Sequence, residues 1–290
     1  MCRLSQRGGR IFLCVFLILV KVATDAHPNP LSMARRVYDA DAFMYYPGRL
    51  VQAPIVMLSG LVAGDWIWTD VRDTLVAAGY PCVTMRHPIA VTHSSIDAAA
   101  CELGEALDQF AIQRAMILGA SLGSAVALAY AVDNAHRVET LVLSGAPAMG
   151  GRSLGIASFG KLTRSIAFDV ARGLFHDRSR IADEQIEHAF RLFLDRRHLA
   201  NMIRLLREAQ SLDAKIMLRK LEVSTLLIWG DDDKVSDCGD WARLSAYVKN
   251  ATFVRVARCG HLPMVEQPER FTSALLAYMC KPRASVSAAI

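Results

Sequence analysis

Closely spaced cysteine pairs are missing from this sequence. Its 7 cysteines lie far apart along the chain, and no two of them form a C-x-x-C motif. Zinc sites and disulfide frameworks both depend on clustered cysteines, so the sequence predicts neither of them. We expect most of these thiols to be small, buried, apolar side chains.

Repeats, biased tracts and basic runs are missing as well. No segment recurs at a fixed period and no low-complexity stretch occurs, which excludes solenoid, fibrous and disordered classes. No basic run is interleaved with aromatic residues, so nucleic-acid binding is not expected. What the chain does contain is apolar: 53% of its 290 residues are apolar and 21% are charged. This is enough for one large core, or for a core with an insertion.

The first thirty residues differ from the rest. Arginines precede an apolar run at 11–20, and small residues follow it as far as Ala26. Ten apolar residues are too few to span a bilayer, so residues 1–26 predict a cleaved signal peptide and an exported protein, secreted or periplasmic. Lys21, directly after the run, leaves an uncleaved N-terminal membrane anchor open. A start of translation at Met33 would instead give a cytoplasmic protein.

Short apolar runs alternate with segments of helical spacing in residues 33–147. Such runs, each ending at a turn or an irregular segment, predict buried parallel strands. The expected strands are 53–58, 81–85, 115–118 and 139–143, and the expected helices are 65–78, 95–110 and 125–132. This alternation predicts an α/β fold, with a doubly wound, mostly parallel sheet and helices on both faces.

The alternation stops at residues 148–222, which have only helical periodicity. Helices are expected at 154–174, 181–194 and 198–218. A second part of the core, 223–282, has expected strands at 223–229 and 251–256 and expected helices at 237–249 and 268–280. The last residues, 283–290, are expected to be a disordered tail. An all-helical insertion near strand ends is typical of a lid over a binding site. Residues 147–224 hold 14 Lys and Arg against 9 Asp and Glu. This basic surplus would suit an anionic substrate, but a solvated charged face is the favoured interpretation.

One hydroxyl stands at the corner between an expected strand and a small-residue helix. Ser121 is flanked by Gly119 and Gly123 in the pattern G-x-S-x-G. A strand that turns sharply into a helix strains the corner residue, and only small neighbours two positions away let the chain pass so close to itself. The corner side chain then lies above the sheet with a helix N-terminus behind it. Ser121 is therefore the candidate nucleophile.

A serine hydroxyl needs a base, and the base needs a group that orients it. Three consecutive carboxylates, 231–233, follow the expected strand 223–229, and His261 follows the strand 251–256. The chain order is thus serine, aspartate, histidine, and this is the order found in α/β-hydrolases.

The chain resembles the α/β-hydrolase superfamily over essentially all of residues 35–282. The segment around Ser121 matches the nucleophile elbow, 230–233 matches the G-x-x-D acid turn, and 259–269 matches the G-H-x-P…E-x-P-E ending. The resemblance selects Asp233 from the three carboxylates and implies His261 as the catalytic base. Dehalogenase and epoxide-hydrolase activities are excluded, because those enzymes carry aspartate at the elbow.

The oxyanion loop departs from the family pattern. Members usually have His-Gly after the first core strand, and this chain has Ser59-Gly60-Leu61. By position, the backbone N–H groups of Leu61 and Leu122 are the expected oxyanion donors. We expect Ser59, Gly60 and His93, the last in an unusual loop after the second strand, to contact substrate.

The resemblance implies a serine hydrolase that acts on an ester or related carbonyl bond of a small to medium, largely apolar substrate through an acyl-enzyme. The same triad also supports C–C bond hydrolysis, lactone opening, perhydrolysis or lyase chemistry, and a non-catalytic ligand-binding member is a further alternative. No cofactor and no metal ion are implied. The expected partner is a small-molecule substrate, and any contact with a membrane would involve only the N-terminal segment.

Overall fold

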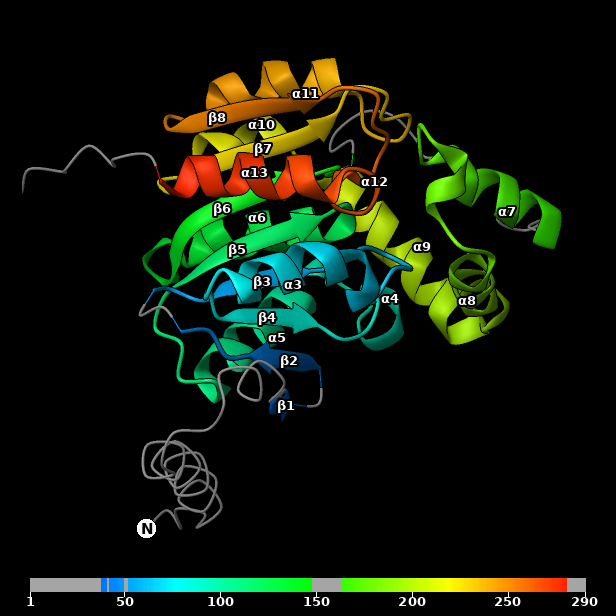
Figure 1. The fold of residues 1–290 in the computed structure, drawn as a ribbon. Helices are drawn as coiled ribbons and strands as arrows, with labels where there is room; N and C mark the ends of the chain where they lie inside the picture. Colours follow the sequence, from blue (N-terminus) through cyan, green and yellow to red (C-terminus); the bar gives the residue numbers. More distant parts are fainter. Residues whose placement is uncertain (1–37, 41, 50–51, 148–162, 281–290) are drawn as a thin grey trace, which may run out of the picture. The chain divides into compact units, whose positions relative to one another are not determined.

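The computed structural model describes residues 38–40, 42–49, 52–147 and 163–280. Within these residues eight strands form one sheet in the order β1-β2-β4-β3-β5-β6-β7-β8 (Figure 1). The strands are β1 (Tyr38–Ala40), β2 (Phe43–Tyr46), β3 (Ile55–Leu58), β4 (Cys82–Met85), β5 (Ala115–Ala120), β6 (Val138–Ser144), β7 (Ser224–Gly230) and β8 (Ala251–Val256). From β3 to β8 all pairings are parallel. The predicted α/β fold with a mostly parallel sheet is confirmed.

Two antiparallel strands at one edge were not predicted. The first predicted strand is 53–58, whereas β1 and β2 precede it in the chain; β1 pairs with β2, and β2 pairs with β4. In β2 only Phe43 is buried, and the next three residues are half-buried. The run at 42–46 is apolar throughout and is itself a strand signal, so β2 could have been predicted from the sequence, whereas the three-residue β1 is too short to give one.

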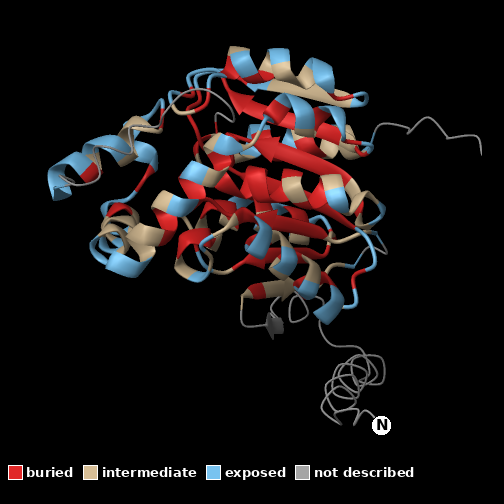
Figure 2. Ribbon diagram, turned by 180° about the vertical axis from the view of Figure 1, so that it is seen from behind, coloured by how far each residue is buried: buried red, intermediate tan, exposed pale blue. Residues whose placement is uncertain are grey.

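Helices cover both faces of the sheet. The helices outside the insertion are η1 (Asp65–Trp68), α3 (Thr69–Ala77), α4 (Ile89–Thr92), α5 (Ile96–Gln109), α6 (Leu122–Asp133), η2 (Ala135–Arg137), α11 (Cys238–Leu244), η5 (Ser245–Tyr247), α12 (Pro263–Glu266) and α13 (Pro268–Met279). One apolar cluster joins α5, α6 and α11 to one face of the sheet, and a second joins η1, α3 and α13 to the other. The strands at the centre of the sheet, β3 to β7, are almost entirely buried between these layers (Figure 2), whereas β2 and β8 are mostly half-buried.

The connection between β6 and β7 contains only helices in its described part, residues 163–222. These are α7 (Arg164–Gly173), η4 (Arg178–Arg180), α8 (Asp183–Leu194), α9 (Arg196–Ser211) and α10 (Ala214–Arg219). The third predicted helix is in fact two, because the chain breaks after α9 and the side chain of Asp213 accepts a hydrogen bond from Ile216 N at 3.0 Å, which caps α10. The helical insertion is confirmed, while its role as a lid stays a prediction.

Within the insertion, α9 differs from α7 and α8. Its Met202 and Leu205 are fully buried against the sheet's helical layer, whereas α7 and α8 are mostly exposed or half-buried (Figure 2). The predicted signal or anchor at 1–26 and the predicted tail at 283–290 lie outside the described residues. In the part of the chain that the structure describes, no helix has the length and apolarity needed to cross a membrane.

Candidate active site

Ser121 occupies a strained corner between β5 and α6. Its backbone has φ 53° and ψ −122°, a conformation that costs a residue other than glycine about 1–3 kcal/mol. A Cβ on Gly119 would lie 2.5 Å from the carbonyl oxygen of Gly123, and a Cβ on Gly123 would lie 2.4 Å from the carbonyl oxygen of Ser59. Only glycine fits at these two positions, so the structure has the geometry that the G-x-S-x-G pattern predicts.

The corner is fixed to the end of β6. The N–H of Ser121 donates to the carbonyl of Ser144 at 2.8 Å. The buried hydroxyl of Ser124 donates to the carbonyls of Gly119 at 2.7 Å and Ser144 at 3.0 Å, and it accepts from the Ser144 N–H at 3.2 Å. Ser124 was not among the predicted site residues, and its only signal in the sequence is its place three residues after Ser121 in a helix of small residues.

His261 and Asp233 form a buried pair. His261 Nδ1 lies 3.0 Å and 2.9 Å from the two carboxylate oxygens of Asp233, and the side chains are 5% and 0% exposed. Asp233 Oδ1 also accepts from the N–H groups of Val235 and Ser236, both at 2.9 Å. A carboxylate held in this way assigns the proton to Nδ1, which leaves Nε2 free to act as a base.

Three consecutive residues at the end of β6 bring the candidate triad together. The carbonyl of Ser144 holds Ser121, as described above. Gly145, with φ +59°, lies against the imidazole: a Cβ there would be 2.9 Å from His261 Cε1. The carbonyl of Ala146 accepts a short hydrogen bond from the hydroxyl of Ser236, in the turn that carries Asp233. The β6 end therefore contacts all three elements of the triad.

The neighbouring carboxylates have other contacts. Asp231 and Asp232 are exposed, whereas Asp233 is buried. Asp231 Oδ1 accepts weakly from the N–H of Cys259 at 3.4 Å, and Asp232 Oδ2 lies 2.5 Å from Nδ1 of His176 in the insertion. The structure thus brings Asp233 to His261 and places the other two carboxylates outside the pair.

The predicted oxyanion loop passes directly over the nucleophile. A Cβ on Gly60 would lie 3.4 Å from Ser121 Cβ and 3.9 Å from its Oγ. The carbonyls of Gly60 and Leu61 accept from the first two N–H groups of α4, at 3.2 Å and 3.4 Å. Leu122 is the first residue of α6, so its N–H has no acceptor within the helix. Both predicted donors thus border Ser121, Leu122 as its chain neighbour and Leu61 through Gly60.

Two of the predicted substrate-contact residues, Ser59 and His93, differ in their hydrogen bonding. The hydroxyl of Ser59 is buried and has no hydrogen-bond partner among the described residues. Nδ1 of His93 is hydrogen-bonded to the hydroxyl of Thr92 at 2.8 Å, and Nε2 lies 3.3 Å from a carboxylate oxygen of Glu102 in α5 without making a hydrogen bond to it. His93 thus lies between the end of α4 and the side chain of Glu102 in α5, and a contact between any of these residues and substrate stays a prediction.

Two polar side chains of α9 bond to the segment 90–96, which runs from α4 to the start of α5. Asn201, which is buried, donates from Nδ2 to the carbonyl of Ala90 at 3.0 Å, and Glu208 accepts from the N–H of Ile96 at 2.9 Å. Since α4 in turn holds the oxyanion loop, the insertion reaches the candidate site from this side. The sequence carried no signal for either contact, because each joins residues more than 110 positions apart.

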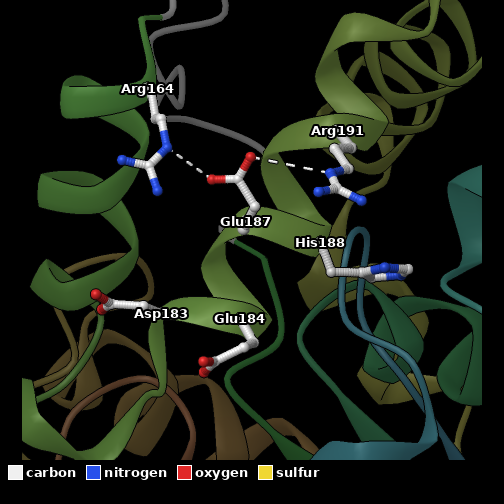
Figure 3. Close-up of a pocket in the computed structure, with 6 residues that line it drawn as sticks. All are labelled: Arg164, Asp183, Glu184, Glu187, His188 and Arg191. Atoms are coloured by element: carbon white, nitrogen blue, oxygen red, sulfur yellow. Dashed lines mark hydrogen bonds and ion pairs between the residues drawn. The ribbon is translucent and has the colours of Figure 1, made fainter.

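The arginines of α7 and α8 are paired with acids of the same two helices. Glu187 lies between Arg164, at 2.7 Å, and Arg191, at 3.9 Å, and these residues border a cavity of about 450 Å³ (Figure 3). No residue of the candidate triad lines this cavity. The pairing agrees with the prediction of a charged, solvated face. Among the residues that the structure describes, no group of three or more His, Cys, Asp or Glu side chains is placed to hold a metal ion.

Comparison with known proteins places this geometry in a family. Residues 55–274 match the model of the alpha/beta hydrolase family. The chain is 29% identical over 248 residues to a 2-hydroxy-6-oxononadienedioate/2-hydroxy-6-oxononatrienedioate hydrolase of Paraburkholderia xenovorans, covering 78% of this chain and 86% of the relative. It is 27% identical over 252 residues to the enzyme of the same name in Escherichia coli, covering 79% and 87%.

Solved structures share the fold. A bacterial membrane phospholipase A superposes with a TM-score of 0.73 at 19% identity, covering 93% of this chain and 98% of that one. A meta-cleavage product hydrolase from Pseudomonas fluorescens superposes with a TM-score of 0.69 at 18% identity, covering 86% and 98%. The family match spans both halves of the sheet and every element of the candidate triad. The chain therefore belongs to the alpha/beta hydrolase family, and it is a hydrolase.

Proposed function

We propose that this chain hydrolyses a ketone by breaking the adjacent carbon–carbon bond, with Ser121 as nucleophile, His261 as base and Asp233 as its orienting partner. The observation that supports these roles is that residues 144–146, at the end of β6, contact Ser121, His261 and the turn that carries Asp233. A strained serine, a buried His–Asp pair and a loop that passes over the serine are the parts that acyl transfer needs.

The names of the relatives support the bond type. A 2-hydroxy-6-oxononadienedioate contains a ketone and two carboxylates but no ester, so a hydrolase of that compound adds water across a carbon–carbon bond next to the ketone. Eight relatives with this name match over at least 78% of the chain. They favour the C–C alternative over the ester hydrolysis that the sequence analysis put first.

The reaction divides into two steps. Ser121 Oγ bonds to the ketone carbon while His261 Nε2 takes the hydroxyl proton, and the amides of Leu61 and Leu122 stabilise the oxyanion. The carbon–carbon bond then breaks, and its electron pair leaves with the departing carbon, which receives the proton from His261. Water attacks the acyl-enzyme, its proton passes through His261 to Ser121, and a carboxylic acid leaves. One water molecule is consumed overall.

The departing carbon needs an electron sink. In the 2-keto tautomer of a 2-hydroxy-6-oxodienoate, the electron pair left on C5 is delocalised through the neighbouring double bond onto the C2 carbonyl. A simple ketone offers no such delocalisation, so the proposal predicts turnover of conjugated 2-hydroxy-6-oxo compounds and none of saturated ketones.

The test compares two substrates and two serine variants. The purified chain is incubated with a 2-hydroxy-6-oxononadienedioate, followed by the loss of dienol absorbance, and with p-nitrophenyl butyrate. Ser121→Ala should abolish turnover, whereas Ser211→Ala, which removes an exposed hydroxyl at the end of α9, should retain it. Turnover of the ester alone would replace C–C hydrolysis by ester hydrolysis. Full activity of Ser121→Ala on either substrate would overturn the nucleophile.

A further inference from the structure

Glu266 is a buried carboxylate that the proposed reaction does not use. It ends α12, is 1% exposed, and accepts hydrogen bonds from three backbone N–H groups. These are Gly260 at 2.7 Å, Asp177 at 2.6 Å and His176 at 3.2 Å. Burying a charge is costly unless it is compensated, and hydrogen bonds to an ionised group are stronger than neutral ones. Such a carboxylate holds its partners firmly in place.

The three donors come from two different parts of the fold. Gly260 immediately precedes His261 in the loop after β8. His176 and Asp177 belong to the segment between α7 and η4, in the helical insertion. We call residues 174–177 of that segment the base strap. Glu266 is thus bonded at once to the loop of the catalytic base and to the insertion.

The base strap also contacts the histidine loop directly. The N–H of His261 donates to the carbonyl of Leu174 at 2.7 Å. A Cβ on Gly260 would lie 2.2 Å from the same carbonyl oxygen and 2.8 Å from the Cα of Phe175. Backbone lies on backbone here, with no side chain between the strap and the loop of the base.

A second tie joins the strap to the acid turn. His176 Nδ1 faces Asp232 Oδ2, and the N–H of Asp232 donates to the carbonyl of Cys259 at 2.9 Å. Because Asp232 is the chain neighbour of Asp233, the strap spans the two turns whose side chains form the His–Asp pair. This second tie is exposed, whereas the carboxylate of Glu266 is buried.

We propose that Glu266 is a positioning residue for the catalytic base. Because Glu266 bonds to both the base strap and the loop of His261, the position of His261 depends on how the insertion packs against that loop. The inference rests on the proposed role of His261. Glu266 fixes the backbone before His261 and holds the strap against it, while Asp233 and Gly145 fix the imidazole. Loss of the carboxylate leaves the buried N–H of Gly260 and the part-buried N–H groups of His176 and Asp177 without their acceptor, so the backbone before His261 is no longer held to the strap.

The first experiment removes the acceptor oxygens of Glu266 in steps. Glu266→Gln keeps the shape and one acceptor oxygen, and Glu266→Ala keeps neither; Glu269→Ala removes an exposed carboxylate nearby as a control. The measurement is the rate at which a fluorophosphonate labels Ser121 in the full chain, together with kcat and KM. A displacement of 1 Å in a catalytic group costs about 100-fold, so we expect roughly 3–10-fold slower labelling for Gln and about 30–100-fold for Ala, with KM little changed.

The second experiment acts from the insertion side. Asp177→Pro removes the backbone N–H that donates to Glu266, and the observed φ of −93° is near the range of proline. Asp177→Ala is its reference, because it loses the same side chain and keeps the N–H. We expect roughly 5–10-fold slower labelling in the proline variant than in the alanine variant. The low-field proton resonance of His261 Nδ1–H should shift or broaden in the proline variant alone.

The outcomes separate the two proposals. No labelling of the wild-type chain would overturn the serine mechanism itself. Labelling of the wild type with equal rates in Glu266→Gln, Glu266→Ala and the proline variant would leave Glu266 a purely structural residue and overturn the inference. If Glu266→Ala does not fold, the comparison of Asp177→Pro with Asp177→Ala decides, because each of these variants retains the carboxylate.

Discussion

Gly145→Ala tests the meeting point of the triad most directly. The residue lies at the end of β6 with φ +59°, and an added Cβ would be 2.9 Å from His261 Cε1 and 3.1 Å from its Nδ1. It would also be 2.8 Å from the carbonyl oxygen of His261. The substitution therefore pushes on both the ring and the backbone of the proposed base, and it adds no charge and no polar group.

Its magnitude follows from these distances. Carbon atoms in ordinary contact are about 3.5 Å apart, so the imidazole has to move by roughly half an ångström. Since a misplacement of 1 Å costs about 100-fold in rate, we expect kcat and the labelling rate of Ser121 to fall by about 10-fold or more. A left-handed backbone costs alanine about 1–2 kcal/mol, which lowers the melting temperature by roughly 2–4 °C per kcal/mol in a domain of this size.

The assay needs a glycine control. Gly173, near the end of α7, has no heavy atom within 4 Å of its would-be Cβ and no positive φ, so Gly173→Ala should keep the wild-type labelling rate. Both variants are labelled with a fluorophosphonate well below their melting temperatures, and the rates are compared. Wild-type labelling of Gly145→Ala would refute the reasoning, because it would mean that His261 can be displaced from this position without cost.

Three further predictions concern the acid, the nucleophile and the thiols. Asp233→Asn should lower kcat by about 10⁴-fold, because the amide no longer selects the Nδ1–H tautomer of His261. Asp232→Asn should lower kcat far less, and steady-state kinetics on any substrate that the wild type turns over checks both. Ser121→Gly should be inactive, yet its free energy of unfolding in urea should exceed that of Ser121→Ala by about 1 kcal/mol. Glycine relieves the backbone strain at this position, and this gain exceeds the extra entropy that glycine gives the unfolded chain. Equal stability of the two variants would contradict the presence of strain at Ser121. Burial raises the pKa of the Cys82 thiol to about 12, so iodoacetamide at pH 8 should alkylate the exposed Cys101 and spare Cys82 until the chain unfolds, as peptide mass spectrometry would show.

Local chain geometry explains why the triad could be predicted from the sequence. Ser121 stands in a glycine pattern that has one structural solution, and Asp233 and His261 each follow an apolar run that ends at a turn. In a parallel sheet the carboxyl ends of the strands lie at one edge, so residues at three such ends are expected together. The choice of Asp233 among three carboxylates came from the family resemblance, and burial in the structure agrees with it.

The supporting residues could not be predicted, because their roles depend on sheet order. β6 lies between β5 and β7, so its end borders both the nucleophile and the acid turn. The sequence shows Ser144 and Gly145 only as the residues that end a strand. Likewise, the motif that contains Glu266 was recognised, but its partners at 176–177 are about 90 positions away. Long-range backbone contacts of this kind leave no periodic pattern in the chain.

The insertion is built into the candidate site at two points. The base strap bonds to His261 and Glu266, and Asn201 of α9 holds α4, whose first two N–H groups hold the oxyanion loop. A state in which the whole insertion swings away could admit substrate, but it would lose the backbone partner of the base and the support of Leu61 together. Movement that preserves the proposed chemistry is therefore confined to α7 and α8, on either side of the strap, each of which has only one buried residue, Ala167 and Ile186.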